Sequence, residues 1–84
     1  MPPPPVKSAT RAIDVLELLA DGPQAPTHGD LARALGMPKS SLSELLATLE
    51  SRGYVTCEAD RYRLGPALLA LAGTLLRRMD VARI

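Results

Sequence analysis

The sequence predicts a mainly helical domain that carries one small β-hairpin. Apolar residues recur at helical spacing in four separate segments, at positions 12–20, 31–35, 42–49 and 68–79. Leucine and alanine, both good helix formers, supply most of these residues. Tyr54 and Tyr62, outside these segments, are the only large aromatic residues of the sequence. Residues 54–64 instead show short strand-like runs on both sides of a polar tip. A chain of 84 residues is long enough for one small domain.

The N-terminal part of the chain consists of a leader and a first helix. Residues 1–7 should form a disordered, proline-rich leader, because four consecutive prolines favour extended geometry and cannot donate helical hydrogen bonds. Ser8 is the expected N-cap of a helix over about residues 9–20. That helix should end where Gly22 is followed by Pro23, since glycine favours the end of a helix and proline cannot continue it.

Two further segments have the pattern of helices joined by a tight turn. Thr27 and Asp30 resemble a capping box, with Asp in place of the usual Glu, and open a helix over about residues 28–35. Gly36 can adopt the positive φ that ends this helix abruptly, and a third helix follows over about residues 38–51. Each helix has one apolar stripe that should be buried, formed by Leu31, Ala32 and Leu35 and by Leu42, Leu45, Leu46 and Leu49. This arrangement is a helix-turn-helix.

A hairpin and a last helix complete the predicted fold. Residues 54–57 and 61–64 should form two short antiparallel strands, and a final helix should run from about 67 to 79. A hairpin directly after a helix-turn-helix forms a wing. The fold class is therefore a winged helix-turn-helix with a three-helix core, a two-stranded wing and a C-terminal linker or dimerisation helix. We expect the winged domain to span 8–66 and the linker helix to span 67–84.

The final helix is apolar on nearly all of its sides. Its large apolar residues are Leu68, Leu69, Leu71, Leu75, Leu76 and Met79. One small domain cannot cover such a helix all round, so the pattern indicates that a partner surface covers part of it. We expect the first and the last helix to form the contacts of a homodimer.

Composition excludes several classes of function. Cys57 is the only cysteine, so there is no internal disulfide and no cysteine pair for a metal, as is typical of the reducing cytoplasm. No secretory signal is visible, and no apolar run reaches the ~18 residues that span a bilayer. One histidine, one cysteine and scattered acids form no catalytic triad, carboxylate pair or glycine-rich phosphate loop. We therefore expect no enzyme, cofactor or metal site, and we interpret His28 as a surface residue.

The charge of the chain is nearly balanced. A formal net charge of +1 argues mildly against a nucleic-acid partner, because nucleic-acid-binding domains are usually basic. The distribution of charge is more favourable, since four basic residues cluster after the turn, namely Lys39, Arg52, Arg61 and Arg63. A modest local basic surface is therefore expected.

Three strings of residues occur in a recognisable order: SATRAIDVLELLA at 8–20, DLARALGMPKSSLSELLATLESRGYV at 30–55 and RYRLGPALLALA at 61–72. Together they resemble the N-terminal winged helix-turn-helix DNA-binding domain of the isocitrate lyase regulator (IclR) family of bacterial transcription factors. The resemblance implies a dimer that binds double-stranded DNA in the cytoplasm, at the nucleoid. Family members usually continue into a larger domain that binds a small-molecule effector. We therefore expect these 84 residues to be a fragment of a longer regulator.

The third helix has a polar side opposite its leucines. At about 100° per residue, Ser40, Glu44 and Ala47 lie on this side, and Ser43 and Thr48 flank it. These residues are candidates for contacting base edges, because a helix in the major groove presents its outward side to the bases.

Further DNA contacts follow from the resemblance. At the N-terminus of the third helix it implies contacts to phosphate and nearby bases from Lys39, Ser40 and Ser41. It also implies that Arg61 and Arg63 reach the flanking backbone or the minor groove, and that Arg11 reaches a phosphate. Alternating charge on a two-stranded hairpin is also typical of ordinary solvated surface. One of the two hairpin arginines is expected to have only that role.

Glu44 departs from the family pattern, which often places a basic residue at this position. A carboxylate is repelled by phosphate and can only accept a hydrogen bond, for example from the amino group of cytosine. Three interpretations stay open. Glu44 is a specificity element, or DNA binding is weak, or Glu44 pairs with Lys39 or Thr48 and does not meet a base.

These observations support two hypotheses about function. The first is a sequence-specific DNA-binding domain of a dimeric bacterial transcriptional regulator, with helix 38–51 in the major groove and hairpin 54–64 beside it. Its operator would be pseudo-palindromic, with half-sites about 34–36 Å or a multiple of that apart. An effector would act only through the downstream domain. The alternative is a winged-helix dimerisation or protein-interaction module with weak or no specific DNA binding, because fold does not determine function.

Overall fold

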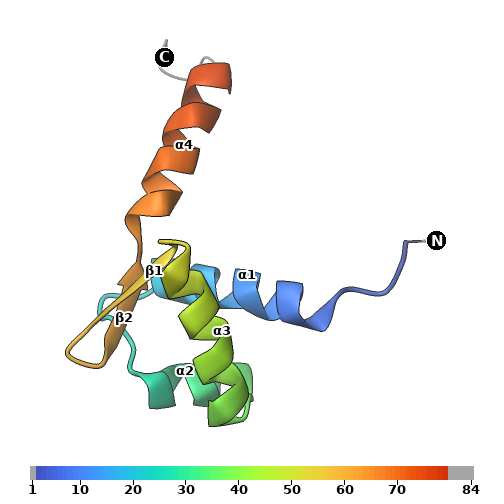
Figure 1. Cartoon of the computed structure of the whole chain (residues 1–84), viewed down its shortest axis with the longest axis vertical. Coiled ribbons are helices and arrows are strands. Elements are labelled where there is room, and N and C mark those ends of the chain that lie inside the picture. The colour runs from blue at the N-terminus through green and yellow to red at the C-terminus, as the bar shows by residue number, and fades with distance from the viewer. Residues whose placement is uncertain (1, 80–84) are drawn as a thin grey trace.

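The computed structural model describes residues 2–79, which form four helices and one hairpin (Figure 1). In chain order the elements are α1 (Lys7–Ala20), α2 (His28–Leu35), α3 (Lys39–Ser51), β1 (Val55–Glu58), β2 (Arg61–Leu64) and α4 (Pro66–Met79). The predicted winged helix-turn-helix is confirmed, with α1 to α3 as its core and the β1–β2 hairpin as its wing. Within residues 2–79, no helix combines the length and apolar content needed to cross a membrane. Residue 1 and residues 80–84, the end of the predicted linker helix, lie outside the described residues.

The starts of two helices differ from the prediction. Val6 is the extended residue before α1, and its carbonyl accepts the N–H of Thr10 at 3.0 Å, so Lys7 belongs to the helix and not to the leader. Ser8 was wrong as the N-cap because the helix begins without any side-chain cap. Pro38 is likewise the extended residue before α3, with ψ at 144°, and not its first helical residue. The first N–H groups of any helix have no partner within the helix, and at α1 and α3 no side chain of the N-cap residue binds them. The start of each of these two helices is therefore set by backbone conformation alone.

The turn between α2 and α3 has the predicted chemistry. The Thr27 hydroxyl accepts the Asp30 N–H at 3.2 Å, and the Asp30 carboxylate accepts the Thr27 N–H at 3.0 Å, so the capping box is confirmed. These hydrogen bonds with Thr27, together with the nearby positive charge of Arg33, lower the pKa of Asp30. Gly36 ends α2 in the left-handed region with φ at 63°, a conformation that favours glycine.

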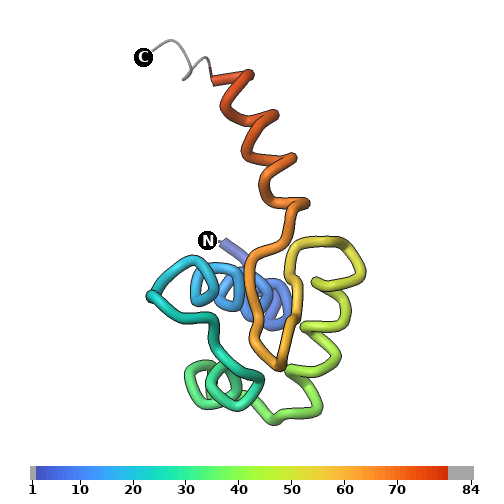
Figure 2. The backbone as a smooth tube through the Cα atoms, turned by 90° about the vertical axis from the view of Figure 1, so that its left-hand side faces the viewer, coloured from blue at the N-terminus to red at the C-terminus, as the bar shows by residue number. Residues whose placement is uncertain are grey.

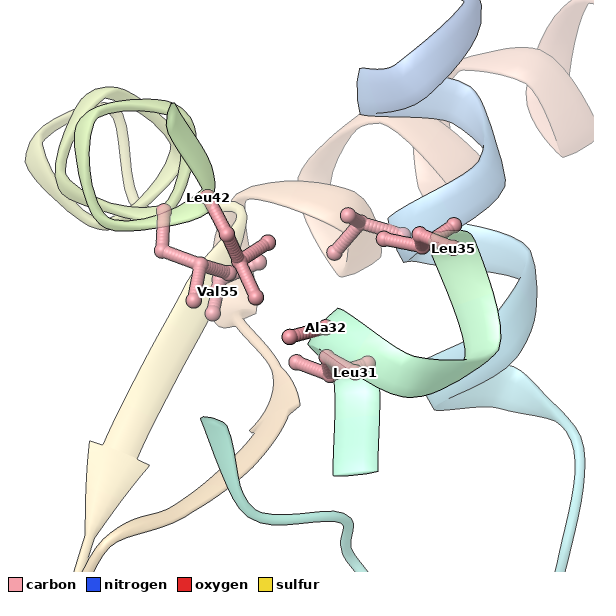
Figure 3. Close-up of a cluster of buried hydrophobic side chains, with 7 residues drawn as sticks. Leu31, Ala32, Leu35, Leu42 and Val55 are labelled. Carbon is pink, nitrogen blue, oxygen red and sulfur yellow. The ribbon is translucent and has the colours of Figure 1, made fainter. Parts of the chain in front are cut away.

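The core lies where the three helices of the domain meet the first strand. Figure 3 shows the Leu42 and Val55 side chains lying toward Leu31, Ala32 and Leu35 of α2. The buried residues of the core are Val15, Leu31, Ala32, Leu35, Leu42, Leu46 and Val55. The predicted apolar stripes of α2 and α3 are therefore confirmed, with Leu45 and Leu49 packed at the margin of the core.

The buried side of α1 differs from the side that its apolar pattern predicts. The helical pattern in this segment consists of positions 12, 13, 16, 19 and 20. Val15, outside that pattern, is the one fully buried residue of α1, whereas Ile13 is 57% exposed. Two positions along a helix correspond to about 200° of rotation, so Ile13 lies nearly opposite Val15. The half-buried Leu16 and Leu19 lie between these extremes and pack against the core.

The wing is an antiparallel hairpin that packs between two helices. Its strands pair from Val55 with Leu64 to Glu58 with Arg61, and β1 lies next to α3 while β2 lies next to α1 (Figure 2). Strand β1 begins one residue later than predicted, because the N–H of Tyr54 is bonded to the carbonyl of Leu49 in α3. The two turn residues, 59 and 60, both have positive φ, as a tight two-residue hairpin requires.

Gly65 joins the wing to α4 at a point of close backbone approach. Its N–H bonds to the carbonyl of Tyr54 at 2.8 Å, and a Cβ at this position would overlap the backbone of Gly53. Beyond this point α4 leads away from the rest of the domain (Figures 1 and 2), and none of its residues, Pro66–Met79, is buried.

Candidate nucleic-acid interface

One side of α3 is free of contacts with the core. Leu42 and Leu46 are fully buried, and the opposite side of the helix is exposed at Ser40, Glu44 and Ala47. The exposed side of α3 is therefore the side that helical periodicity predicts. The N-terminal residues Lys39, Ser40 and Ser41 are also exposed, and Pro38 supplies no side-chain cap for their N–H groups. Uncapped N–H groups at a helix start are suited to binding an anion such as phosphate.

Four of the predicted contact residues line one open groove. The groove lies between the first half of α1 and α3, has a volume of about 1040 Å³, and includes Arg11, Ser41, Glu44 and Thr48. Arg11 is half-buried and forms an ion pair with Asp14, with 3.6 Å between Nη1 and Oδ2. The tertiary structure thus brings α1 beside the exposed side of α3, and the groove offers both a cation and a carboxylate to a ligand.

Glu44 and Thr48 interact through the backbone and not through the carboxylate. The Thr48 hydroxyl donates to the Glu44 carbonyl oxygen at 3.1 Å, a common use of threonine within a helix. Among residues 2–79, the Glu44 carboxylate forms no ion pair, with Lys39 or with any other basic residue. The carboxylate therefore faces solvent in the groove, and Thr48 has its proton already committed.

Ser43 lies on the other flank of α3, where its side chain meets His28 of α2. The Nε2 atom of His28 lies 2.9 Å from the Ser43 hydroxyl oxygen. The His28 ring also lies against the Tyr62 ring of β2, with 6.4 Å between the ring centres. His28 lies in the first turn of α2 and is half-buried, and its hydrogen bond with Ser43 stays exposed to solvent. No local signal distinguishes it, because both contacts come from other elements of the fold.

Tyr62 anchors the wing against the body of the domain. Partial burial, with a further effect from the neighbouring Cys57 thiol across the hairpin, raises the pKa of the Tyr62 hydroxyl to about 12. The Tyr62 N–H donates to the Pro26 carbonyl at 2.9 Å. The wing is therefore attached to the loop that precedes α2, and Tyr62 stays neutral at physiological pH.

The two wing arginines differ in their surroundings. Arg61 donates from Nη1 to the Ala25 carbonyl at 2.8 Å, so it holds the loop between α1 and α2 against β2. Arg63 is exposed and lies across from Thr56, and within residues 2–79 it forms no ion pair. Arg61 is therefore bonded to a loop within the domain, whereas Arg63 is exposed to solvent.

No cluster of three or more potential metal-ligating side chains occurs in the described part of the chain, 2–79.

An exposed helix that follows a tight turn and is flanked by a hairpin defines the class of winged helix-turn-helix DNA-binding domains. A family model described as the IclR helix-turn-helix domain matches residues 8–58. The chain belongs to the IclR family, and the match makes it a DNA-binding regulatory domain.

Relatives of known name agree with this assignment. The chain is 37% identical over 73 residues to a glycerol operon regulatory protein of Streptomyces griseus, a match that covers 84% of this chain and 29% of that protein. It is 30% identical over 80 residues to the HTH-type transcriptional regulator XynR of Escherichia coli, with 93% of this chain and 32% of that protein covered. The chain therefore spans only about a third of the length of these transcriptional regulators.

Solved structures have the same fold. The IclR transcriptional regulator of Alicyclobacillus acidocaldarius superposes with a TM-score of 0.79 at 33% identity, over 83% of this chain and 29% of that one. HmgR of Pseudomonas aeruginosa superposes with a TM-score of 0.79 at 32% identity, over 93% of this chain and 34% of that one. Similarity to DNA-binding regulators favours the first functional hypothesis over an interaction module without DNA binding.

Proposed function

We propose that this chain binds double-stranded DNA sequence-specifically, with α3 in the major groove and the β1–β2 wing on the flanking backbone or in the minor groove. The observation that carries the proposal is the exposed polar side of α3, which stands opposite the buried Leu42 and Leu46. A helix held this way has a polar side that is free to meet base edges. Membership of the IclR family supports the same arrangement.

The candidate residues divide into two roles. Ser40, Ser43, Glu44 and Ala47, on the exposed side of α3, would contact bases. Residues on the margins would contact phosphates and set the register of the domain on the duplex, namely Arg11, Lys39, Ser41, Arg61 and Arg63. Thr48 would offer only acceptor sites, because its proton is used within α3. Affinity should therefore depend mainly on the margins, and sequence preference mainly on the centre of α3.

We also propose that the domain acts as a homodimer through α4 and the exposed side of α1. Within Pro66–Met79 no residue is buried, and Leu68, Leu71 and Leu75 follow one another at the spacing of three and then four positions that a coiled-coil stripe has. Ile13 adds apolar surface on α1. A two-fold dimer would present two copies of α3 to a pseudo-palindromic operator, with half-sites about 34–36 Å apart or a multiple of that.

The names of its relatives support a proposal about the setting of the domain. The proteins it matches are named as regulators, so we propose a non-enzymatic role in the cytoplasm, at the nucleoid. Because the chain spans about a third of their length, we propose that it works within a longer regulator, in which a further domain binds a small-molecule effector. Movement of α4 would transmit the state of that domain to the spacing of the two α3 helices.

Replacing Arg63 with alanine tests the placement of the wing. Each phosphate that a basic side chain neutralises adds about one unit to the slope of log affinity against log salt concentration. Because Arg63 is exposed and makes no ion pair within residues 2–79, Arg63→Ala should flatten this slope by about one unit without unfolding the domain. Binding of a fluorescent duplex between about 50 and 200 mM salt measures the slope.

The matched control for this variant is Arg77→Ala, which removes the same charge from the exposed end of α4, at a position about 120° away from Leu71 around the helix. Its slope should equal that of the wild type. Equal slopes for the wild type and Arg63→Ala would place the wing away from the duplex. If the wild type itself binds random and selected duplexes equally well at moderate salt, the proposal of sequence-specific binding is wrong.

Replacing Leu75 with aspartate tests the dimer. Leu75 is 56% exposed in the single chain, and a carboxylate there would be desolvated without a partner in an apolar interface. The dissociation constant of the dimer should rise by about tenfold or more, as measured by sedimentation equilibrium. Ala70→Asp is the control, since Ala70 lies about 140° away around α4 and is also exposed. Equal weakening by both variants would contradict an interface on the Leu75 side.

A further inference from the structure

His28 lies where α2 meets the two elements of the proposed DNA-binding surface, α3 and the wing. It is the first residue of α2, its ring lies against Tyr62 of the wing, and its Nε2 atom lies 2.9 Å from the Ser43 hydroxyl on α3. His28 and Ser43 are 15 positions apart in the chain, so the contact exists only in the folded domain.

The hydrogen bond between His28 and Ser43 is not needed to hold α2 against α3. The bond is exposed, and an exposed hydrogen bond between neutral groups adds little to stability because water replaces it. The packing of the two helices instead depends on the buried side chains of Leu31 and Leu42. The position of the bond, on a flank of the exposed side of α3, therefore suggests a role at the surface and not in the fold.

The chemistry of the two groups indicates what that role is. A serine hydroxyl has one proton to donate and two acceptor sites, whereas each nitrogen of a neutral imidazole either donates or accepts. If Nε2 accepts the Ser43 proton, the hydroxyl keeps only acceptor sites, which match the amino groups of adenine and cytosine. If Nε2 donates, the Ser43 proton stays available for the acceptor atoms of guanine and thymine. In the first case His28 limits Ser43 to base edges that donate a hydrogen bond, and in the second it fixes the orientation of the hydroxyl, which keeps its proton and one acceptor site.

We propose that His28 is a positioning residue for sequence recognition, which acts through Ser43 by fixing its hydroxyl and setting the hydrogen bond that Ser43 offers to a base. The inference rests on the proposed function, since it concerns the base preference of α3. His28 itself touches no base in this proposal. Its contact with Tyr62 keeps the ring in place when the wing meets the duplex.

The test compares the duplexes that each variant of the 84-residue chain selects from a random-sequence library. His28→Ala should change the preferred base at one position per half-site, and Ser43→Ala should change the preference at the same position. On the duplex that the wild type selects, each variant should bind about threefold to tenfold more weakly, the effect of one lost hydrogen bond. The double variant should bind no more weakly than Ser43→Ala alone, because His28 acts only through Ser43.

A conservative variant and a control separate this role from a structural one. His28→Gln keeps a hydrogen-bonding group near the Nε2 position and should restore the wild-type base preference. Gln24→Ala, at an exposed position in the loop between α1 and α2, should select the wild-type sequence. Thermal unfolding followed by circular dichroism identifies any variant that is misfolded.

Three results would overturn the inference. One is an unchanged base preference in His28→Ala, and another is a double variant whose loss of affinity is the product of the two single losses. The third is His28→Gln with the same altered preference as His28→Ala. A wild-type chain that selects no sequence at all would instead overturn the proposed function, and this inference with it.

Discussion

Replacing Leu42 with alanine should lower the free energy of unfolding by about 2–5 kcal/mol, the range seen for buried leucines. Leu42 is 0% exposed and packs at the point where α3 meets α2 and β1 (Figure 3). The truncated side chain would leave a cavity whose walls belong to three different elements. Because small domains are marginally stable, a loss of this size is a large fraction of the total. Urea unfolding followed by circular dichroism measures it.

The control for this substitution is Leu69→Ala, which makes the same chemical change on α4. Leu69 is 76% exposed in the single chain, so its truncation should change the free energy of unfolding by less than about 0.5 kcal/mol. Both variants should be compared at concentrations where the chain is monomeric. A Leu42→Ala protein as stable as the wild type would contradict the burial of Leu42 between α2 and α3.

Replacing Glu44 with arginine should strengthen binding to random duplex by roughly 10- to 100-fold at low salt. The carboxylate faces solvent in the groove beside Arg11 and forms no ion pair within residues 2–79, so nothing in the described chain offsets its repulsion of phosphate. The substitution removes this repulsion and adds a cation that can neutralise a phosphate, and the expected gain corresponds to about 1.4–2.8 kcal/mol. Sequence preference should change as well, because Arg favours guanine where a carboxylate favours cytosine.

Two comparisons isolate the cause of this effect. Glu44→Gln removes only the negative charge and should give an intermediate affinity. Glu17→Arg makes the same change in net charge on the exposed part of α1, beside Asp14 and Asp21, and should have a much smaller effect. Equal affinities for Glu44→Arg and Glu17→Arg would mean that only net charge matters and that Glu44 lies away from the duplex.

Much of the fold could be predicted because its signals are local. The capping box at Thr27 and Asp30, the left-handed Gly36 and the leucine stripe of α3 each depend on residues a few positions apart. The start of α1 could not be predicted in the same way. Its N-cap Val6 has no capping side chain, so only the backbone conformation after the prolines marks the boundary.

The candidate site was predicted in part, for the same reason. Helical periodicity identified the exposed side of α3 correctly, because that side is defined by the leucines opposite it. The two wing arginines had the same local pattern, and nothing in it separated Arg61, which binds a loop carbonyl, from the solvent-facing Arg63.

The sequence by itself determined the order and type of the helices and strands, the family, and the exposed polar side of α3. Only the tertiary structure decided which side chains on that surface have partners within the fold. The contact of His28 with Ser43 joins residues 15 positions apart, and that of Arg61 with Ala25 joins residues 36 positions apart. Contacts of this kind result from the packing of α2 on α3 and of the wing on the preceding loop. Periodicity along one element carries no information about the distance to a side chain on another.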